Sequence, residues 1–301
     1  MQSDILPILS SSQRALLLSQ SGANSARFLT ATPTTPETTF RPGLLEVAIK
    51  RRLRLPLPTL TSHCDGTHCT ERVDNLGDHR TNCTRTGRLK RRSVPMERMW
   101  ARVFREAGAQ VTQQKCMSEL DLGVQGLDGR RVDFVAYGLP IFSGMPIAGD
   151  STMVSPVTGA GTAIAVKAGT QAGVALERAT AKKHKTYPEF TSYSIAPKAK
   201  FYPLPCEVGG RWGSECLEIV RLLAKCKARD EPDCLRRSVE LGKSARWWAM
   251  LSVTAQSVFA ASLLDNFSFQ AVDDLTPDPF LENVLSDNAY DDGPPVSRLG
   301  A

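Results

Sequence analysis

The sequence lacks any run of about 18 apolar residues, the length that a membrane-spanning helix needs. Its first residues also lack the basic start and the small-residue cleavage site of a secretory signal. Hydrophobic residues (42%) and charged residues (23%) have the shares that a globular domain needs to bury a core. We therefore expect an intracellular protein with no membrane partner and one sizeable core.

Cysteine is too sparse for a disulfide scaffold, at eight in 301 residues, and histidine is rarer still, at four. Most of the possible metal ligands nevertheless fall within residues 63–83: His63, Cys64, His68, Cys69, His79 and Cys83. The spacing Cys64-x4-Cys69-x9-His79-x3-Cys83 supplies the thiolate and imidazole groups that hold zinc tetrahedrally. His63 and His68 are alternatives to Cys64. Residues 62–84 are thus predicted to form a structural zinc knuckle.

Charge is unevenly distributed along the chain. Nine lysines and arginines but a single acid, Glu97, lie between Arg80 and Arg105. A basic block beside a metal-like cluster predicts contacts with the phosphates of nucleic acid, although a solvated charged face is the alternative. The residues expected to make these contacts are Arg85, Arg88, Lys90, Arg91 and Arg92. Residues 265–301 carry eight acids and one arginine, and we expect a disordered acidic tail there.

The remaining segments predict one domain preceded by a linker. Residues 1–61 are expected to be linker-like, with a short amphipathic helix over 43–58. Residues 85–264 contain a helix beginning near Pro95, a favoured first-turn residue, and ending at Gly108. Strand-like segments follow at 108–116, 128–138 and 146–156, then a helix at 174–187, a strand at 199–209 and helices to 264. This order predicts an α/β fold with a mixed sheet flanked by helices.

Acidic residues in the strand region suggest a second metal site. Asp133 lies inside an otherwise apolar strand, where an unpartnered carboxylate is costly, and Asp150 begins the next strand. With Glu97 from the preceding helix, the two could hold Mg²⁺ or Mn²⁺, which activates water against a phosphodiester. Surface acids at strand ends are the alternative. The lysine that often stands two residues after the second acid is replaced by Thr152.

The helix predicted after this strand carries Lys182, Lys183 and Lys185, any of which could take the place of that lysine. The alternative is that the three lysines form a solvated face of the helix.

Several stretches resemble the region that follows the polymerase in retrotransposons without long terminal repeats that carry a restriction-like endonuclease. They include VDNLGDHRTNC, RTGRLKRRSVPMERMWARVFREAGAQV, DGRRVDFVAYGLPIF, AGDSTMVSP, KKHKTYPEF and EVGGRW. The resemblance spans residues 17–264 and implies a zinc knuckle before a nuclease domain of the PD-(D/E)xK type. It implies that Asp133 and Asp150 are the catalytic acids and that Lys183 is a displaced catalytic lysine. Cys69, His79 and Cys83 match the knuckle.

The resemblance implies a protein that nicks DNA. We expect DNA, and RNA as a further candidate, as its partners, and a location in the nucleus or elsewhere inside the cell. Two positions depart from the family: Thr67 replaces the first cysteine of a Cys-x-Cys pair, and Tyr137 stands where an acid is common. No polymerase Y-x-D-D motif is found, because Tyr290 is followed directly by Asp291. A degraded, catalytically inactive nucleic-acid-binding module is therefore the alternative to an active nuclease.

Overall fold

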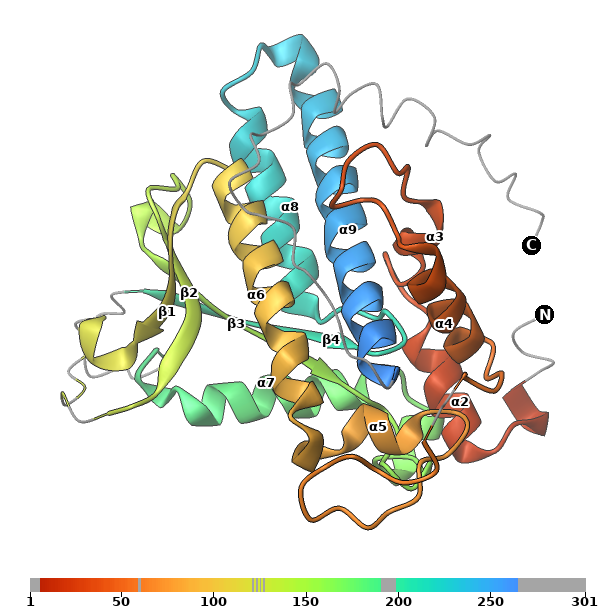
Figure 1. Ribbon diagram of the computed structural model, residues 1–301. Coiled ribbons are helices and arrows are strands. Elements are labelled where there is room, and N and C mark those ends of the chain that lie inside the picture. Colours follow the sequence, from red (N-terminus) through yellow and green to blue (C-terminus); the bar gives the residue numbers. More distant parts are fainter. Residues whose placement is uncertain are drawn as a thin grey trace.

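The structure is a computed structural model that describes residues 6–58, 61–120, 122, 124, 126, 128–190 and 199–264 (Figure 1). The α-helices are α2 (Ser11–Ser19), α3 (Arg27–Thr30), α4 (Pro42–Arg52), α5 (Asp78–Asn82), α6 (Arg88–Glu106), α7 (Val174–Thr186), α8 (Ser214–Ala228) and α9 (Asp233–Leu263). The strands are β1 (Gln110–Cys116), β2 (Arg131–Tyr137), β3 (Ile147–Val154) and β4 (Lys200–Glu207). Short 3₁₀ turns are η1 (Leu6–Ile8), η2 (Thr84–Thr86), η3 (Met117–Glu119), η4 (Phe142–Gly144), η5 (Val166–Gly169) and η6 (Pro188–Phe190).

The four strands form one mixed sheet in the order β1-β2-β3-β4. The first two pairings are antiparallel, and β3 runs parallel to β4 because α7 lies in the connection between them. Figure 1 shows α7 along one face of the sheet, while α6, α8 and α9 stand on the other. The predicted α/β class, with a mixed sheet flanked by helices, is confirmed.

Side-chain alternation along the strands separates two cores. Ile147 of β3 packs with Trp100, Phe104 and Trp247 on the α6 side, whereas the next residue, Ala148, packs with Phe201 on the α7 side. Gly149 must be glycine, because a Cβ there would lie 2.2 Å from Cζ of Phe134. The following residue, Asp150, therefore falls on the α7 side of the sheet.

The N-terminal segment differs from the expected linker. Residues 11–52 include three helices, and Phe28, Val47 and Ala48 are buried against Phe259 and Leu263 of α9. The serine, threonine and proline content of this segment suggested a loose chain. Its few large apolar residues are nonetheless enough to anchor it, because those of α3 and α4 face α9 and Leu16 of α2 packs with Val157 and Val174.

Helix α6 begins seven residues before the expected start, at Arg88, and Pro95 lies inside it. Gly87 precedes the helix with a left-handed φ of 67°. The acidic tail predicted over 265–301 lies outside the described residues. Among the residues that the structure describes, none of the helices is both long and apolar enough to span a bilayer.

Candidate metal centre and acidic site

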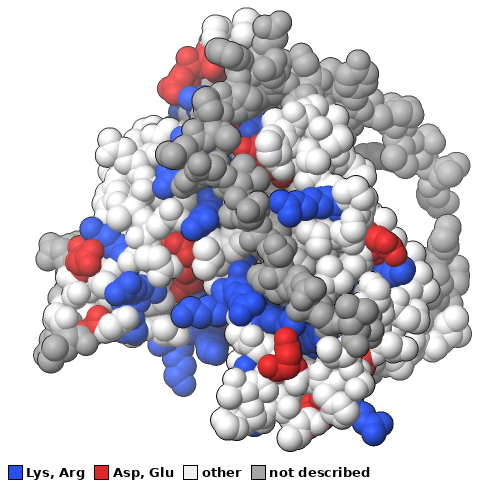
Figure 2. Space-filling model, viewed as in Figure 1, with Lys and Arg blue, Asp and Glu red and all other residues white. Residues whose placement is uncertain are grey.

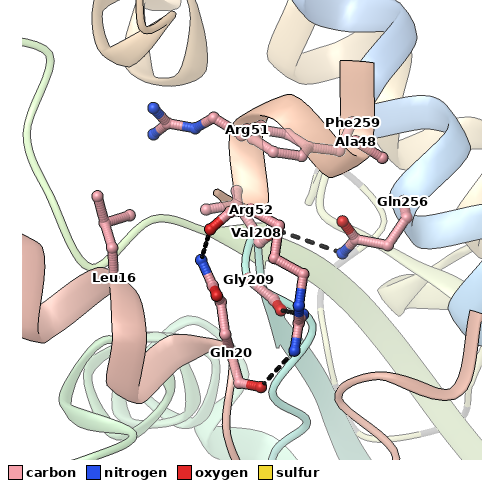
Figure 3. Close-up of a pocket in the computed structure, with 9 residues that line it drawn as sticks. All are labelled: Leu16, Gln20, Ala48, Arg51, Arg52, Val208, Gly209, Gln256 and Phe259. Carbon is pink, nitrogen blue, oxygen red and sulfur yellow. Dashed lines mark hydrogen bonds between the residues drawn. The ribbon is translucent and has the colours of Figure 1, made fainter. Parts of the chain in front are cut away.

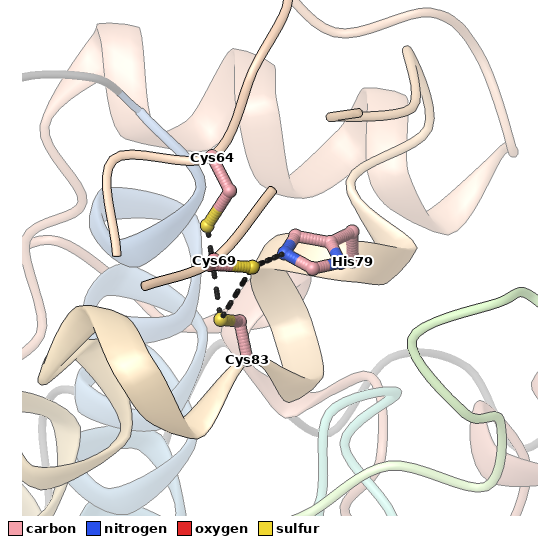
Figure 4. A group of neighbouring side chains, drawn as sticks. All are labelled: Cys64, Cys69, His79 and Cys83. Atoms are coloured by element: carbon pink, nitrogen blue, oxygen red, sulfur yellow. Dashed lines mark hydrogen bonds between the residues drawn. The ribbon is translucent and has the colours of Figure 1, made fainter. Parts of the chain in front are cut away.

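Four side chains point toward one another, those of Cys64, Cys69, His79 and Cys83 (Figure 4). Their ligand atoms all lie within 4.8 Å of one another. The Sγ atoms of Cys64 and Cys83 are 3.7 Å apart, and Sγ of Cys69 is 3.5 Å from Nε2 of His79. A tetrahedral zinc site has S···S edges of roughly 3.8 Å and S···N edges of roughly 3.6 Å, from the usual bond lengths. The predicted cluster is confirmed as one that could bind zinc.

The structure selects Cys64 over the two alternative histidines. The four-ligand group contains Cys64 and neither of these histidines, and Nδ1 of His63 instead lies 3.0 Å from Oγ of Ser62. The cysteines are free thiols, and their separation is far beyond a disulfide bond.

Asp74 and Gly77 position His79. The Asp74 carboxylate accepts hydrogen bonds from the backbone N–H groups of Leu76, Asp78 and His79, at 2.8 to 3.0 Å. These bonds satisfy donors at the start of α5 that have no partner within the helix. Gly77 takes a left-handed φ of 80°, which glycine adopts without a steric penalty. The turn directs His79 toward the cysteines.

Arginines beside the cluster bind the end of α9. Arg80, adjacent to His79, donates to the carbonyl of Leu263 at 2.7 Å. Arg88 donates to the carbonyl of Ser262 at 3.0 Å and to Asp65, next to Cys64, at 2.6 Å. The last carbonyls of a helix lack partners within the helix. The knuckle therefore fastens the C-terminal turn of α9.

This arrangement corrects part of the predicted nucleic-acid contacts. Arg88 and Arg92 are each 2% exposed. Arg92 donates to the carbonyl of Thr81 at 2.6 Å, and burial lowers the pKa of its guanidinium group to about 10. Buried guanidinium groups that bind backbone carbonyls cannot reach a phosphate in solution, so the prediction is wrong for these two residues.

The other three predicted contacts, Arg85, Lys90 and Arg91, are exposed, as is Arg98 further along α6. Figure 2 shows lysine and arginine side chains gathered over α6 in the lower half of this face.

The two predicted acids lie where the ladder between strands β2 and β3 ends. This ladder ends at the pair Phe134 and Gly149. Beyond it, the Asp133 carboxylate accepts hydrogen bonds from both the backbone N–H and the hydroxyl of Ser151, each at 2.7 Å. Asp133 thus replaces the backbone partner that β3 loses at this point.

Asp150 is buried, at 2% exposure, and its Oδ1 lies 2.5 Å from Nζ of Lys183 on α7. Lys182 and Lys185 are exposed on the same helix. Of the three candidate lysines, Lys183 is the one brought to the acids.

Burial is the main influence on the pKa values of Asp133 and Glu97. Burial, and then the charge of Asp150, raises the pKa of Asp133 to about 6, although Ser151 and Lys183 act in the opposite direction. Glu97 lies on α6, and burial followed by the charge of Asp133 raises its pKa to about 7. Carboxylates that share negative charge favour either a proton or a cation.

Glu97 is not a third ligand alongside the two aspartates in this conformation. Among the described residues, the Cys/His cluster is the single group of three or more possible metal ligands whose ligand atoms all lie within 4.8 Å of one another. Glu97, Asp133 and Asp150 do not form such a group. Glu97 accepts hydrogen bonds from the side-chain amides of Gln114, at 2.7 Å, and Gln113, at 3.4 Å.

Tyr187 and Ser151 border the acids, and the sequence interpretation gave neither a role. Tyr187 directly follows α7, four residues after Lys183, and its hydroxyl donates to the carbonyl of Arg131 at 2.5 Å. Burial, and then the charge of Asp150, raises the pKa of Tyr187. The spacing of one helical turn was the available signal for Tyr187, because residues i and i+4 share a helix face.

A small cavity of about 20 Å³ lies elsewhere, between the N-terminal helices and α9 (Figure 3). Arg52 crosses it and donates to the carbonyls of Gln20 and Gly209, at 3.0 and 3.2 Å. Its size suits a single water molecule. It lies apart from both the acids and the cysteines, and it belongs to the packing of the N-terminal segment.

No protein-family model matches the chain, and a comparison with curated proteins gives no match either.

Proposed function

We propose that the chain is a metal-dependent DNA endonuclease of the restriction-like PD-(D/E)xK type, of retrotransposon origin, that nicks DNA in the nucleus. The observation that carries the proposal is the contact between Lys183 and Asp150, with Asp133 on the neighbouring strand. A mixed sheet with helices on both faces is compatible with the fold that the family resemblance implies.

The acids have the chemistry that a hard divalent cation prefers. Asp133 and Asp150 would hold Mg²⁺ or Mn²⁺, since carboxylate oxygens are the usual ligands of these ions. Burial and then the charge of Asp150 raise the pKa of Asp133, so the nearby donors only partly stabilise its ionised form. When bound, such an ion polarises a phosphate and lowers the pKa of its water.

The protein's own residues would act around this centre. The Lys183 ammonium, held beside Asp150, would stabilise charge that develops on a phosphate oxygen. Ser151 fixes the orientation of the Asp133 carboxylate through its two hydrogen bonds. The exposed Lys90, Arg91 and Arg98 would bind DNA phosphates along α6.

A second candidate is a nucleic-acid-binding module without catalysis. Glu97 is not grouped with the two aspartates, which favours this candidate. Asp150 is paired with Lys183, so its carboxylate has a partner without a metal. In both candidates, the Cys/His cluster serves a structural role in fastening α5 and α9.

The test is conversion of supercoiled plasmid to open circles. The zinc-loaded protein should nick the plasmid when Mg²⁺ or Mn²⁺ is added and should not nick it in Ca²⁺. DNA binding without nicking under any of these conditions would favour the second candidate.

A further inference from the structure

Gln114 has a backbone conformation that is unusual for its position. It lies in β1 with a left-handed φ of 53°, whereas strand residues normally have strongly negative φ. The pairing on either side is regular, since Gln113 pairs with Phe134 and Lys115 with Val132. Gln114 therefore stands opposite Asp133. Glutamine is not among the residues that tolerate positive φ well, so the conformation is strained.

The strain has a local consequence for Glu97. Successive side chains of a strand normally point to opposite faces of the sheet. Yet the side-chain amides of both Gln113 and Gln114 reach the Glu97 carboxylate, at 3.4 and 2.7 Å. The left-handed turn at Gln114 breaks the alternation and brings the second amide to Glu97. The shorter of the two contacts comes from the strained residue.

The partners of Glu97 differ from those of the structural acids. Glu106 is buried against Arg102 and Arg246, and Asp78 against Arg51 and Arg54. Those arginines neutralise the carboxylates.

Among the described residues, Glu97 accepts hydrogen bonds from two neutral amides instead. A neutral donor fixes the orientation of a carboxylate without cancelling its charge.

We infer that Gln114 is a positioning residue that fixes the Glu97 carboxylate beside β1, where Gln114 stands opposite Asp133, an inference that rests on the proposed metal-dependent function. Strained residues persist where the surrounding structure requires them, and they cluster at functional sites. Hydrogen bonds to carboxylates near a metal orient them and tune its binding. In this arrangement, Glu97 supplies negative charge to the proposed metal site from the α6 side of the sheet. Gln114 sets the orientation of the Glu97 carboxylate.

The test measures Mn²⁺ binding by electron paramagnetic resonance on the full, zinc-loaded chain, together with thermal unfolding. Gln114→Gly removes the amide and the strain together. Its thermal midpoint should equal or exceed that of the wild type, while its Mn²⁺ affinity should fall about tenfold. Thr112→Gly is the matched control, because Thr112 is an exposed residue of the same strand with regular pairing. It should lower the midpoint and leave Mn²⁺ affinity unchanged.

Unchanged Mn²⁺ affinity in Gln114→Gly would overturn the inference, as would a wild type that does not bind Mn²⁺. A wild type that binds Mn²⁺ without nicking DNA would refute the proposed catalysis alone. The Mn²⁺ affinity of Gln114→Gly relative to the wild type would then still decide the role of Gln114. Gln114→Asn tolerates the left-handed backbone and keeps a shorter amide. It should recover part of the affinity that Gln114→Gly removes.

Discussion

The Nζ atom of Lys183 lies 2.5 Å from Oδ1 of Asp150, although the two residues are 33 positions apart in the sequence. The pair joins α7 to β3 across one face of the sheet. Asp150 has 4% side-chain exposure and Lys183 has 23%, so the pair is largely shielded from water.

Replacing Lys183 by alanine should slow nicking about a hundredfold, the usual effect of removing one donor that stabilises developing charge. It should also destabilise the fold by about 1–3 kcal/mol, because the buried Asp150 carboxylate loses its partner. Plasmid nicking and chemical denaturation measure the two effects. Lys182→Ala and Lys185→Ala, on exposed positions of the same helix, are the matched controls. An equal reduction in all three variants would mean that the helix contributes only general positive charge.

The purified protein should contain about one equivalent of zinc, as expected for a closed four-ligand site. His79→Ala should release it. Because Arg80 and Arg88 hold the carbonyls of Leu263 and Ser262, zinc release should speed amide hydrogen exchange in the last turn of α9. Zinc retention in a Cys69 and Cys83 double variant would contradict the ligand set. Unchanged exchange at α9 after zinc release would contradict the fastening role.

Binding to DNA should weaken steeply with salt, since each neutralised phosphate releases counterions. Replacing Lys90 and Arg91 by alanine should reduce the slope of log affinity against log salt by about 0.9 for each phosphate that is no longer neutralised. Fluorescence anisotropy at several salt concentrations measures the slope. Arg88→Ala is the contrasting variant: it should lower the thermal midpoint, because its guanidinium group binds the end of α9. A slope unaffected by the double replacement would show that α6 does not bind the phosphates.

Glu207, at the end of β4, gives a test of stability against pH. Burial raises its pKa to about 7, while Ser19 and Arg211 act in the opposite direction. A carboxyl with a raised pKa binds its proton more tightly in the folded state, so its favourable contribution is present at low pH and is lost as pH rises through about 7.

Glu207→Gln should therefore stabilise the protein at pH 8, by at most about 3 kcal/mol, and the gain should vanish toward pH 4. Denaturant unfolding at both pH values measures this difference. The exposed Glu177→Gln should show no such trend, and a gain for Glu207→Gln that is the same at both pH values would contradict the assignment.

The sequence was most informative where chemistry is local. The spacing of Cys64, Cys69, His79 and Cys83 predicted the cluster, because a short segment with four ligands can close on one ion. The apolar alternation of the strands and the amphipathic helices predicted the sheet and its flanking layers. Asp133 was identifiable as an acid that an apolar strand would not otherwise tolerate.

The sequence was least informative where a role depends on distant packing. It left three lysines open, because the rotation of α7 against the sheet decides which one faces Asp150. Arg88 and Arg92 were predicted to contact the phosphates of nucleic acid, as part of a basic block. Their guanidinium groups instead bind backbone carbonyls, those of Ser262 and Leu264 at the end of α9 for Arg88 and that of Thr81 for Arg92. The left-handed backbone of Gln114 has no sequence signal, since glutamine disfavours it.

Nicking by the Asp133→Asn variant tests the central claim most directly. Asparagine keeps a carbonyl oxygen for the two donors of Ser151, so the strand junction should persist while the negative charge is removed. Mg²⁺-dependent nicking should fall to background with DNA affinity nearly unchanged, because Asp133 binds no phosphate. Asp128→Asn, which removes an acid paired with Arg130, should nick like the wild type. Full nicking by Asp133→Asn in zinc-loaded protein would contradict the assignment of the acids as the catalytic centre.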